Sequence, residues 1–157
     1  MLARMNALLL AVLCAAPVTP ANTATETVRR IYAQYDLQDA HPDLEPFLSK
    51  EARKGWEAAR EISDQPGFSG VHPLFQADLV IQGQDWKVTE LKLKATKPSG
   101  GRCEVVATFK NFGTPQKVRF KLVLEDGLWR VDDVGADKKD APTIRKQMAE
   151  KIDLATE

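Results

Sequence analysis

The fold is decided by residues 102–134, RCEVVATFKNFGTPQKVRFKLVLEDGLWRVDDV, in which apolar side chains recur at every second position. This period of two is typical of β-strands that bury one face. The alternation pauses at residues 113–115 and again at Asp126-Gly127, a dipeptide that strongly favours a tight hairpin turn. We therefore predict three successive antiparallel strands, over residues 102–112, 116–125 and 128–134.

A fourth strand is predicted just before this stretch, at residues 87–96 (KVTELKLKAT), with a change of buried face near Glu90. Ser49 is placed to cap a helix. The helical spacing of apolar residues predicts three helices, which span residues 25–35, 50–62 and 142–154. Helices followed by consecutive hairpins predict an α+β fold, in which N-terminal helices pack on one face of a curved four-stranded antiparallel sheet and a C-terminal helix follows.

The N-terminus has the pattern of a signal peptide over residues 1–21. The apolar run at residues 7–16 is too short to span a hydrocarbon core of roughly 30 Å. Cleavage after Ala21 would leave residues 22–157, a length that suits a single domain, with no transmembrane segment. We therefore expect a periplasmic or secreted protein. Two alternatives stay open: a buried N-terminal helix of a cytosolic protein, and lipidation at Cys14.

Charge and cysteine content bound the classes of partner. The 22 basic residues equal the 22 acidic residues, so the formal net charge is zero. A general nucleic-acid binder needs a basic surplus, and we expect no nucleic-acid partner. Cys103 is the only cysteine beyond the predicted cleavage site, so it has no internal disulfide partner. It alternates with apolar residues, and we expect it to be buried and inert; an intermolecular disulfide or a reactive thiol is the alternative.

The histidines give no sign of a catalytic or metal site. His41 and His72 each precede a proline in a predicted loop, and no cluster of histidine and cysteine has the spacing of metal ligands. We therefore expect no metal, no cofactor and no enzymatic activity. The alternative is an acid–base pair of His72 with Asp78 or Asp85, since a carboxylate orients an imidazole. Asp132 in the closing strand joins His72 as a candidate pocket residue.

The long connection at residues 63–86 carries the side chains that we expect to contact a partner. It contains proline, glycine and aromatic residues, and exposed aromatics on loops are typical anchors of protein interfaces. The predicted partner-binding residues are Phe68, Phe75, Asp78, Asp85 and Trp86.

Residues 127–134, GLWRVDDV, together with the order of helices and strands, resemble the nuclear transport factor 2-like or cystatin-like superfold. Pro73-Leu74-Phe75 and Gln84-Asp85-Trp86 add a likeness to bacterial envelope proteins of the domain of unknown function 3828 family. The resemblance implies a helical layer packed into a strongly bent sheet, which together form a cone. It also implies export, and it supplies no catalytic residue. Because the superfold hosts enzymes, binders and scaffolds, fold alone assigns no function.

The leading hypothesis is a non-enzymatic protein-binding module of the bacterial envelope. One concrete version is an immunity protein that blocks a secreted peptidoglycan hydrolase toxin. The second hypothesis is a small-molecule-binding or enzymatic cone with His72, Asp85 or Asp132 facing inward. A third is a structural envelope protein that forms a homodimer through its sheet.

Overall fold

The computed structural model describes residues 23–36, 42–63 and 78–154. The predicted signal peptide and the candidate residues Phe68, His72 and Phe75 lie outside these ranges, so the expectations for them stay predictions. The elements, in chain order, are α1 (Ala24–Ala33), the 3-10 turns η2 (Gln34–Asp36) and η3 (Glu45–Phe47), α2 (Lys50–Ser63), β1 (Val88–Ala95), β2 (Arg102–Asn111), β3 (Thr114–Glu125), β4 (Leu128–Ala136) and α3 (Ile144–Leu154).

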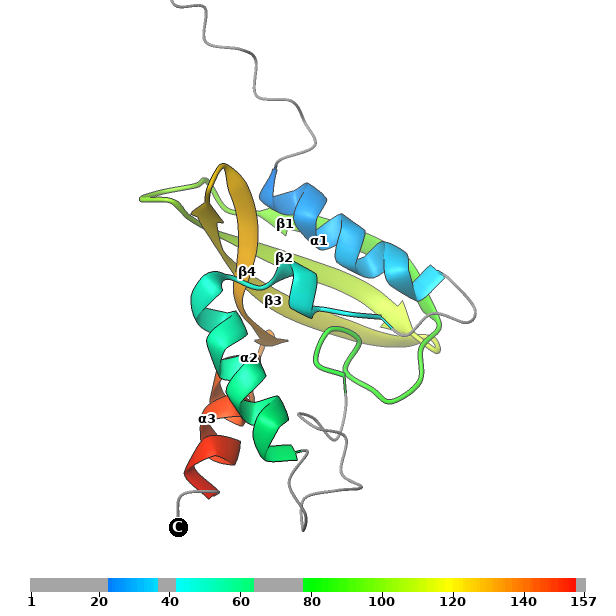
Figure 1. Ribbon diagram of the computed structural model, residues 1–157. Helices are drawn as coiled ribbons and strands as arrows, with labels where there is room; N and C mark the ends of the chain where they lie inside the picture. The colour runs from blue at the N-terminus through cyan, green and yellow to red at the C-terminus, as the bar shows by residue number, and fades with distance from the viewer. Residues whose placement is uncertain (1–22, 37–41, 64–77, 155–157) are drawn as a thin grey trace, which may run out of the picture.

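The four strands form one antiparallel meander in the order β1-β2-β3-β4, and Figure 1 shows that the sheet is strongly curved. Two β-bulges interrupt the ladders, and bulges bend a strand. In β1 the register shifts between Thr89 and Lys92, where Glu90 has a φ of 57°. In β4 the extra residue is Asp132, since Leu122 pairs with Val131 and Lys121 pairs with Asp133. The predicted α+β class and the change of face near Glu90 are both confirmed.

Helix α1 covers the inner face of the sheet, in front of β1 and β2 in Figure 1. Thr23 caps it by accepting a hydrogen bond from Glu26 N at 3.1 Å. The helix buries Tyr32, whose ring centroid lies 5.3 Å from that of Phe109 on β2 and 6.0 Å from that of Phe120 on β3. Cys103 is buried on the same face, as expected.

Helix α2 begins beside the outer edge of β4 and runs next to α3 (Figure 1). Ser49 N donates to Val131 O at 2.8 Å, and Ser49 Oγ accepts from Ala52 N at 3.0 Å. The predicted cap is therefore confirmed, and its residue also closes one edge of the sheet. Gly55 lets the two helices approach, because a Cβ at this position would lie 3.2 Å from Met148 Cε.

One predicted boundary is wrong in an instructive way. The connection of β2 to β3 was expected at residues 113–115, but β3 already begins at Thr114 and the turn consists of Phe112 and Gly113 alone. Pro115 takes a regular place in the ladder opposite Lys110. In the sequence Pro115 suggested a loop, but the positive φ that the turn requires is supplied by Gly113.

Candidate functional site

Two tyrosines hold the segment before β1 against the N-terminal helical region: the Tyr32 hydroxyl of α1 donates to Val80 O at 2.9 Å, and Tyr35 of η2 bonds Asp78. Asp78 Oδ2 accepts a hydrogen bond from the Tyr35 hydroxyl, and Asp78 Oδ1 accepts from Val80 N at 2.7 Å. Burial and the Asp78 charge raise the pKa of Tyr35 well above its usual value. Asp78 was predicted to contact a partner; in the structure both of its carboxylate oxygens are engaged within the fold, and its contact with a partner stays a prediction.

Trp86 lies on the other side of Tyr35. The two rings meet edge to face, with centroids 5.7 Å apart and planes at 86°. Trp86 is half-buried, and its neighbour Asp85 is exposed. Two of the predicted partner-binding residues therefore lie side by side on a supported surface.

Asn111, the last residue of β2, fixes this segment to the end of the sheet. It is 7% exposed and makes three side-chain hydrogen bonds to one short segment. Its Nδ2 donates to Ile81 O at 3.3 Å and to Asp85 O at 3.1 Å, while its Oδ1 accepts from Lys87 N at 2.8 Å. This amide thereby holds the backbone on both sides of Trp86.

Phe112 follows Asn111 and was not identified from the sequence. It is 61% exposed, the highest value among the exposed large apolar residues of the described chain, and its φ is 48°. Non-glycine residues rarely adopt this conformation, and for a bulky one it is an outlier. A Phe-Gly pair in a two-residue hairpin turn, where Asn-Gly or Asp-Gly is preferred, was the signal that could have found it.

These residues form one surface, which we call the aromatic tip. It surrounds an open hollow of about 520 Å³ at the end of the sheet where the β2–β3 turn meets the segment leading into β1, on the right in Figure 1. Its members are Tyr35, Asp36, Asp85, Trp86, Lys87, Val88 and Phe112.

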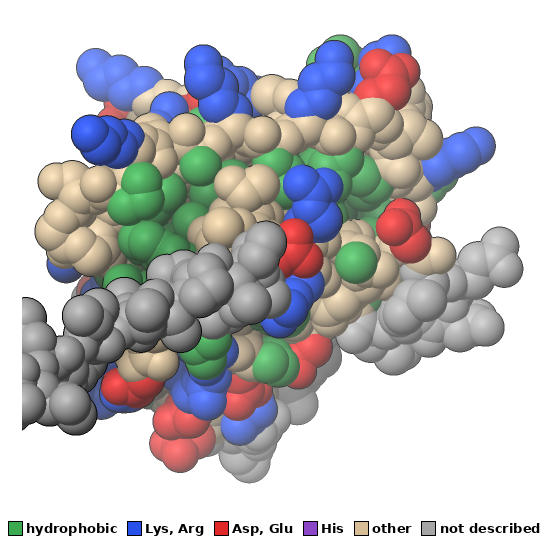
Figure 2. Space-filling view, turned by 90° about the horizontal axis from the view of Figure 1, so that it is seen from above, with side chains coloured by type: hydrophobic (Ala, Val, Ile, Leu, Met, Phe, Trp, Pro, Cys, Tyr) green, Lys and Arg blue, Asp and Glu red, His purple; other side chains and the backbone are tan. Residues whose placement is uncertain are grey.

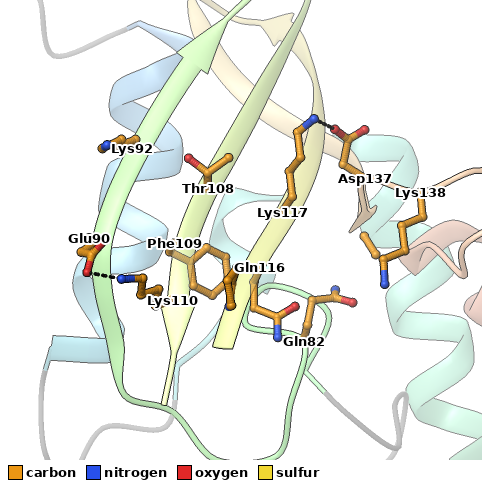
Figure 3. A pocket seen from close by; sticks show the side chains of 12 residues that line it. Gln82, Glu90, Lys92, Thr108, Phe109, Lys110, Gln116, Lys117, Asp137 and Lys138 are labelled. Carbon is orange, nitrogen blue, oxygen red and sulfur yellow. Dashed lines mark hydrogen bonds and ion pairs between the residues drawn. The ribbon is translucent and has the colours of Figure 1, made fainter. Parts of the chain in front are cut away.

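A second surface, the basic face, covers the side of the sheet that α1 leaves open. Figure 2 shows lysine and arginine side chains projecting in a row along one side of the molecule. A hollow of about 430 Å³ lies on this face. Figure 3 shows Lys92, Lys110 and Lys117, which line it from neighbouring strands. Lys110 pairs with Glu90 at 2.6 Å.

Asp137 neutralises the far side of this hollow. It pairs with Lys117 at 2.7 Å and with Arg119 at 2.8 Å, and these cations lower the pKa of its carboxyl group. The basic face is therefore largely charge-compensated, although Lys92 has no ion pair among the described residues.

Asp132, a candidate pocket residue, binds side chains at the N-terminal ends of α2 and α3. One oxygen accepts from Ser49 Oγ at 2.8 Å and the other from Arg145 Nη1 at 3.0 Å. Asp133 also contacts Arg145, whose backbone N donates to it at 3.3 Å. The bulge at Asp132 breaks the strict alternation and brings both carboxylates to the start of α3. Within the described ranges, no group of three histidine, cysteine, aspartate or glutamate residues has an arrangement that could hold a metal ion.

Comparison with known proteins adds one distant likeness. No protein family model matches the chain, and no curated protein matches it. A chain in the crystal structure of the type VI native effector–immunity complex Tae3–Tai3 from Ralstonia pickettii has a similar fold, with a TM-score of 0.51 and 16% identity. The match covers 75% of this chain and 98% of that chain. At this identity the likeness concerns the fold alone. None of the described helices is both long and apolar enough to cross a membrane.

Proposed function

We propose that this protein is an exported, non-enzymatic binding module of the bacterial envelope that acts as an immunity protein against a secreted cell-wall hydrolase. The observation that carries the proposal is the likeness in fold between 75% of this chain and 98% of a chain of an effector–immunity complex. The Tai3 immunity protein of that complex supplies the functional parallel. Export to the periplasm rests on the signal-peptide pattern of residues 1–21.

The aromatic tip supports binding of a protein rather than a small molecule. Trp86 and Phe112 offer apolar area on an open surface, whereas small ligands are usually enclosed in deep clefts. The space between α1 and the sheet is filled by side chains such as Val28, Phe109 and Phe120. Asp78 and Asp132, which the enzymatic alternative would use, are both bound to groups of the fold.

We also propose, from the closing strand at residues 127–134, that the chain belongs to the nuclear transport factor 2-like superfold and is related to the domain of unknown function 3828 family. The bent sheet with α1 on its inner face is compatible with that membership. It leaves the partner open, because members of one superfold differ in function.

The test is co-purification from the native envelope. The full-length chain with a C-terminal tag should retain one stoichiometric partner, and that partner should digest peptidoglycan. Adding one equivalent of this protein should abolish the digestion. The control variant is Leu128→Ala. It removes an exposed apolar side chain (40% exposed) at the start of β4, at the end of the sheet away from the aromatic tip, and the variant should inhibit as well as the natural protein. A partner without hydrolase activity would rule out the immunity role, and retention of no partner would rule out the binding module.

A further inference from the structure

We propose that Phe112 is the anchor residue of the aromatic tip, and that it enters an apolar pocket with a basic rim on the partner protein. This inference rests on the proposed function and names the contact that such a partner would make. It starts from a residue whose conformation and exposure serve no purpose in the isolated fold.

The turn position of Phe112 disfavours its own side chain. At a φ of 48° the Cβ crowds the backbone, and Asn, Asp or Gly relieves this crowding in two-residue hairpin turns. Internal packing does not compensate, because 61% of the residue is exposed to solvent. Strained residues that persist without an internal benefit cluster at binding sites.

The backbone that carries Phe112 is fixed before any partner arrives. Its own N–H donates to Lys87 O at 3.2 Å, and the preceding Asn111 makes its three side-chain hydrogen bonds to the same segment. Trp86 stands beside it on Tyr35, which Asp78 holds in turn. Because this backbone is already fixed, Phe112 loses little backbone freedom on binding, and such preorganisation favours affinity.

The exposed charges of the aromatic tip indicate which residues should surround the pocket on the partner. Asp36, Asp85 and Lys87 are the exposed charged residues around the hollow, and none of them forms an ion pair with a described residue. The aromatic tip thus carries a negative surplus, and its charges are not compensated by ion pairs as those of the basic face largely are. An apolar pocket rimmed by lysine or arginine would complement the tip.

The test substitutes Phe112→Asn and uses the hydrolase that the full-length chain retains. Asparagine suits the turn, so the variant should melt about 4 °C higher than the natural protein. Its affinity for the hydrolase should fall about 30-fold or more, because the anchor is gone while the fold is improved. Asp126→Asn introduces the same residue at the matching turn position, where φ is 51°, without removing an aromatic ring, and should leave the affinity unchanged within about twofold.

The outcomes separate this inference from the function on which it rests. If the natural protein binds and inhibits the hydrolase but Phe112→Asn binds equally well, the anchor is wrong and the immunity role stands. If the natural protein binds no hydrolase, the proposed function itself fails. The basic rim has its own readout: Asp85→Asn should slow association several-fold at low salt and change little in about 0.5 M NaCl. Faster association of that variant would overturn the basic rim.

Discussion

The two turns at opposite ends of β3 have nearly the same backbone and opposite chemistry. The φ values are 48° and 80° at Phe112-Gly113, and 51° and 77° at Asp126-Gly127. The first turn is joined to its surroundings by a buried amide, Asn111. The second is joined to α2 by exposed charges, with Lys50 Nζ 2.8 Å from Asp126 Oδ2. The same backbone geometry therefore serves two purposes. The Asp126-Gly127 turn only connects β3 to β4, whereas at the Phe112-Gly113 turn the buried amide of Asn111 stabilises a backbone that carries an unfavourable residue.

The largest effect is expected when the hydrogen bonds of the buried Asn111 side chain are removed. Asn111→Ala leaves two carbonyls and one N–H of residues 81–87 without their partner, and the free energy of unfolding should fall by about 2–3 kcal/mol. Urea denaturation of the purified protein measures this loss. The matched change at the other turn is Glu125→Ala, which removes a partly exposed carboxylate that accepts from Lys50 N at 3.0 Å, and should cost less than about 1 kcal/mol. Equal losses would show that the two turns are anchored alike.

A second pair of substitutions tests whether the backbones are truly equivalent. Gly113→Ala and Gly127→Ala should each lower the free energy of unfolding by about 1–2 kcal/mol. No atom outside the neighbouring residues lies within 4 Å of a Cβ added at either position, so the cost comes from the positive φ alone. A cost at Gly113 much above that at Gly127 would mean that Phe112 strains the turn beyond its own residue. Thermal unfolding of both variants under one buffer condition decides this.

The aromatic tip has a second internal connection with no counterpart at the Asp126-Gly127 turn. Tyr35→Phe removes the hydroxyl that binds Asp78, and should lower the free energy of unfolding by about 1 kcal/mol at pH 7. Because the pKa of Tyr35 is raised in the folded state, this tyrosine ionises first in the unfolded chain as the pH rises through about 10. The contribution of Tyr35 to stability is therefore complete below that pH and is lost above it.

The same variant should therefore change the pH dependence of stability. Tyr32 also has a raised pKa, because it is buried and lies near Asp78. Above pH 10 each of these tyrosines should reduce the free energy of unfolding by about 1.4 kcal/mol per pH unit, and Tyr35→Phe should remove one such contribution. Denaturant titrations at pH 9, 10 and 11 measure the slope. An unchanged slope would show that Tyr35 ionises equally in both states.

The sequence predicts the sheet better than it predicts the aromatic tip, for a physical reason. Alternation of apolar residues along β2, β3 and β4 is local and repeats over many residues, so chance rarely produces it. Asp126-Gly127 is likewise a local signal. Phe112 is out of phase with the apolar face of β2, yet as an apolar residue next to the strand it was assigned to the strand and not to the turn.

The contacts that build the candidate site are not local. Tyr35 and Asp78 are 43 residues apart, and Asn111 reaches Asp85 across 26 residues. No pattern in either segment announces these pairs. Asp78 was predicted to contact a partner and Asp132 to line a pocket, and these roles stay predictions; in the structure both carboxylates join distant parts of the fold. Asp85 and Trp86 were identified in the sequence and do lie on the aromatic tip, since aromatic and charged residues near a loop end are commonly exposed.

The smallest expected effect concerns the exposed charges at Asp126-Gly127. The hydrogen bond and charge of Lys50 lower the pKa of Asp126, so its ionised form is favoured in the folded state and this preference is lost as the pH falls through the folded pKa. Both side chains are mostly exposed, at 71% and 78%, and salt should screen their attraction. Carbon-detected NMR titration should give Asp126 a pKa that is below the usual aspartate value in dilute buffer and rises towards it in about 0.5 M NaCl. The stability difference between the natural protein and Asn111→Ala should not respond to salt, because neutral, buried hydrogen bonds are not screened; a salt-dependent difference at Asn111 would remove the distinction between the two turns.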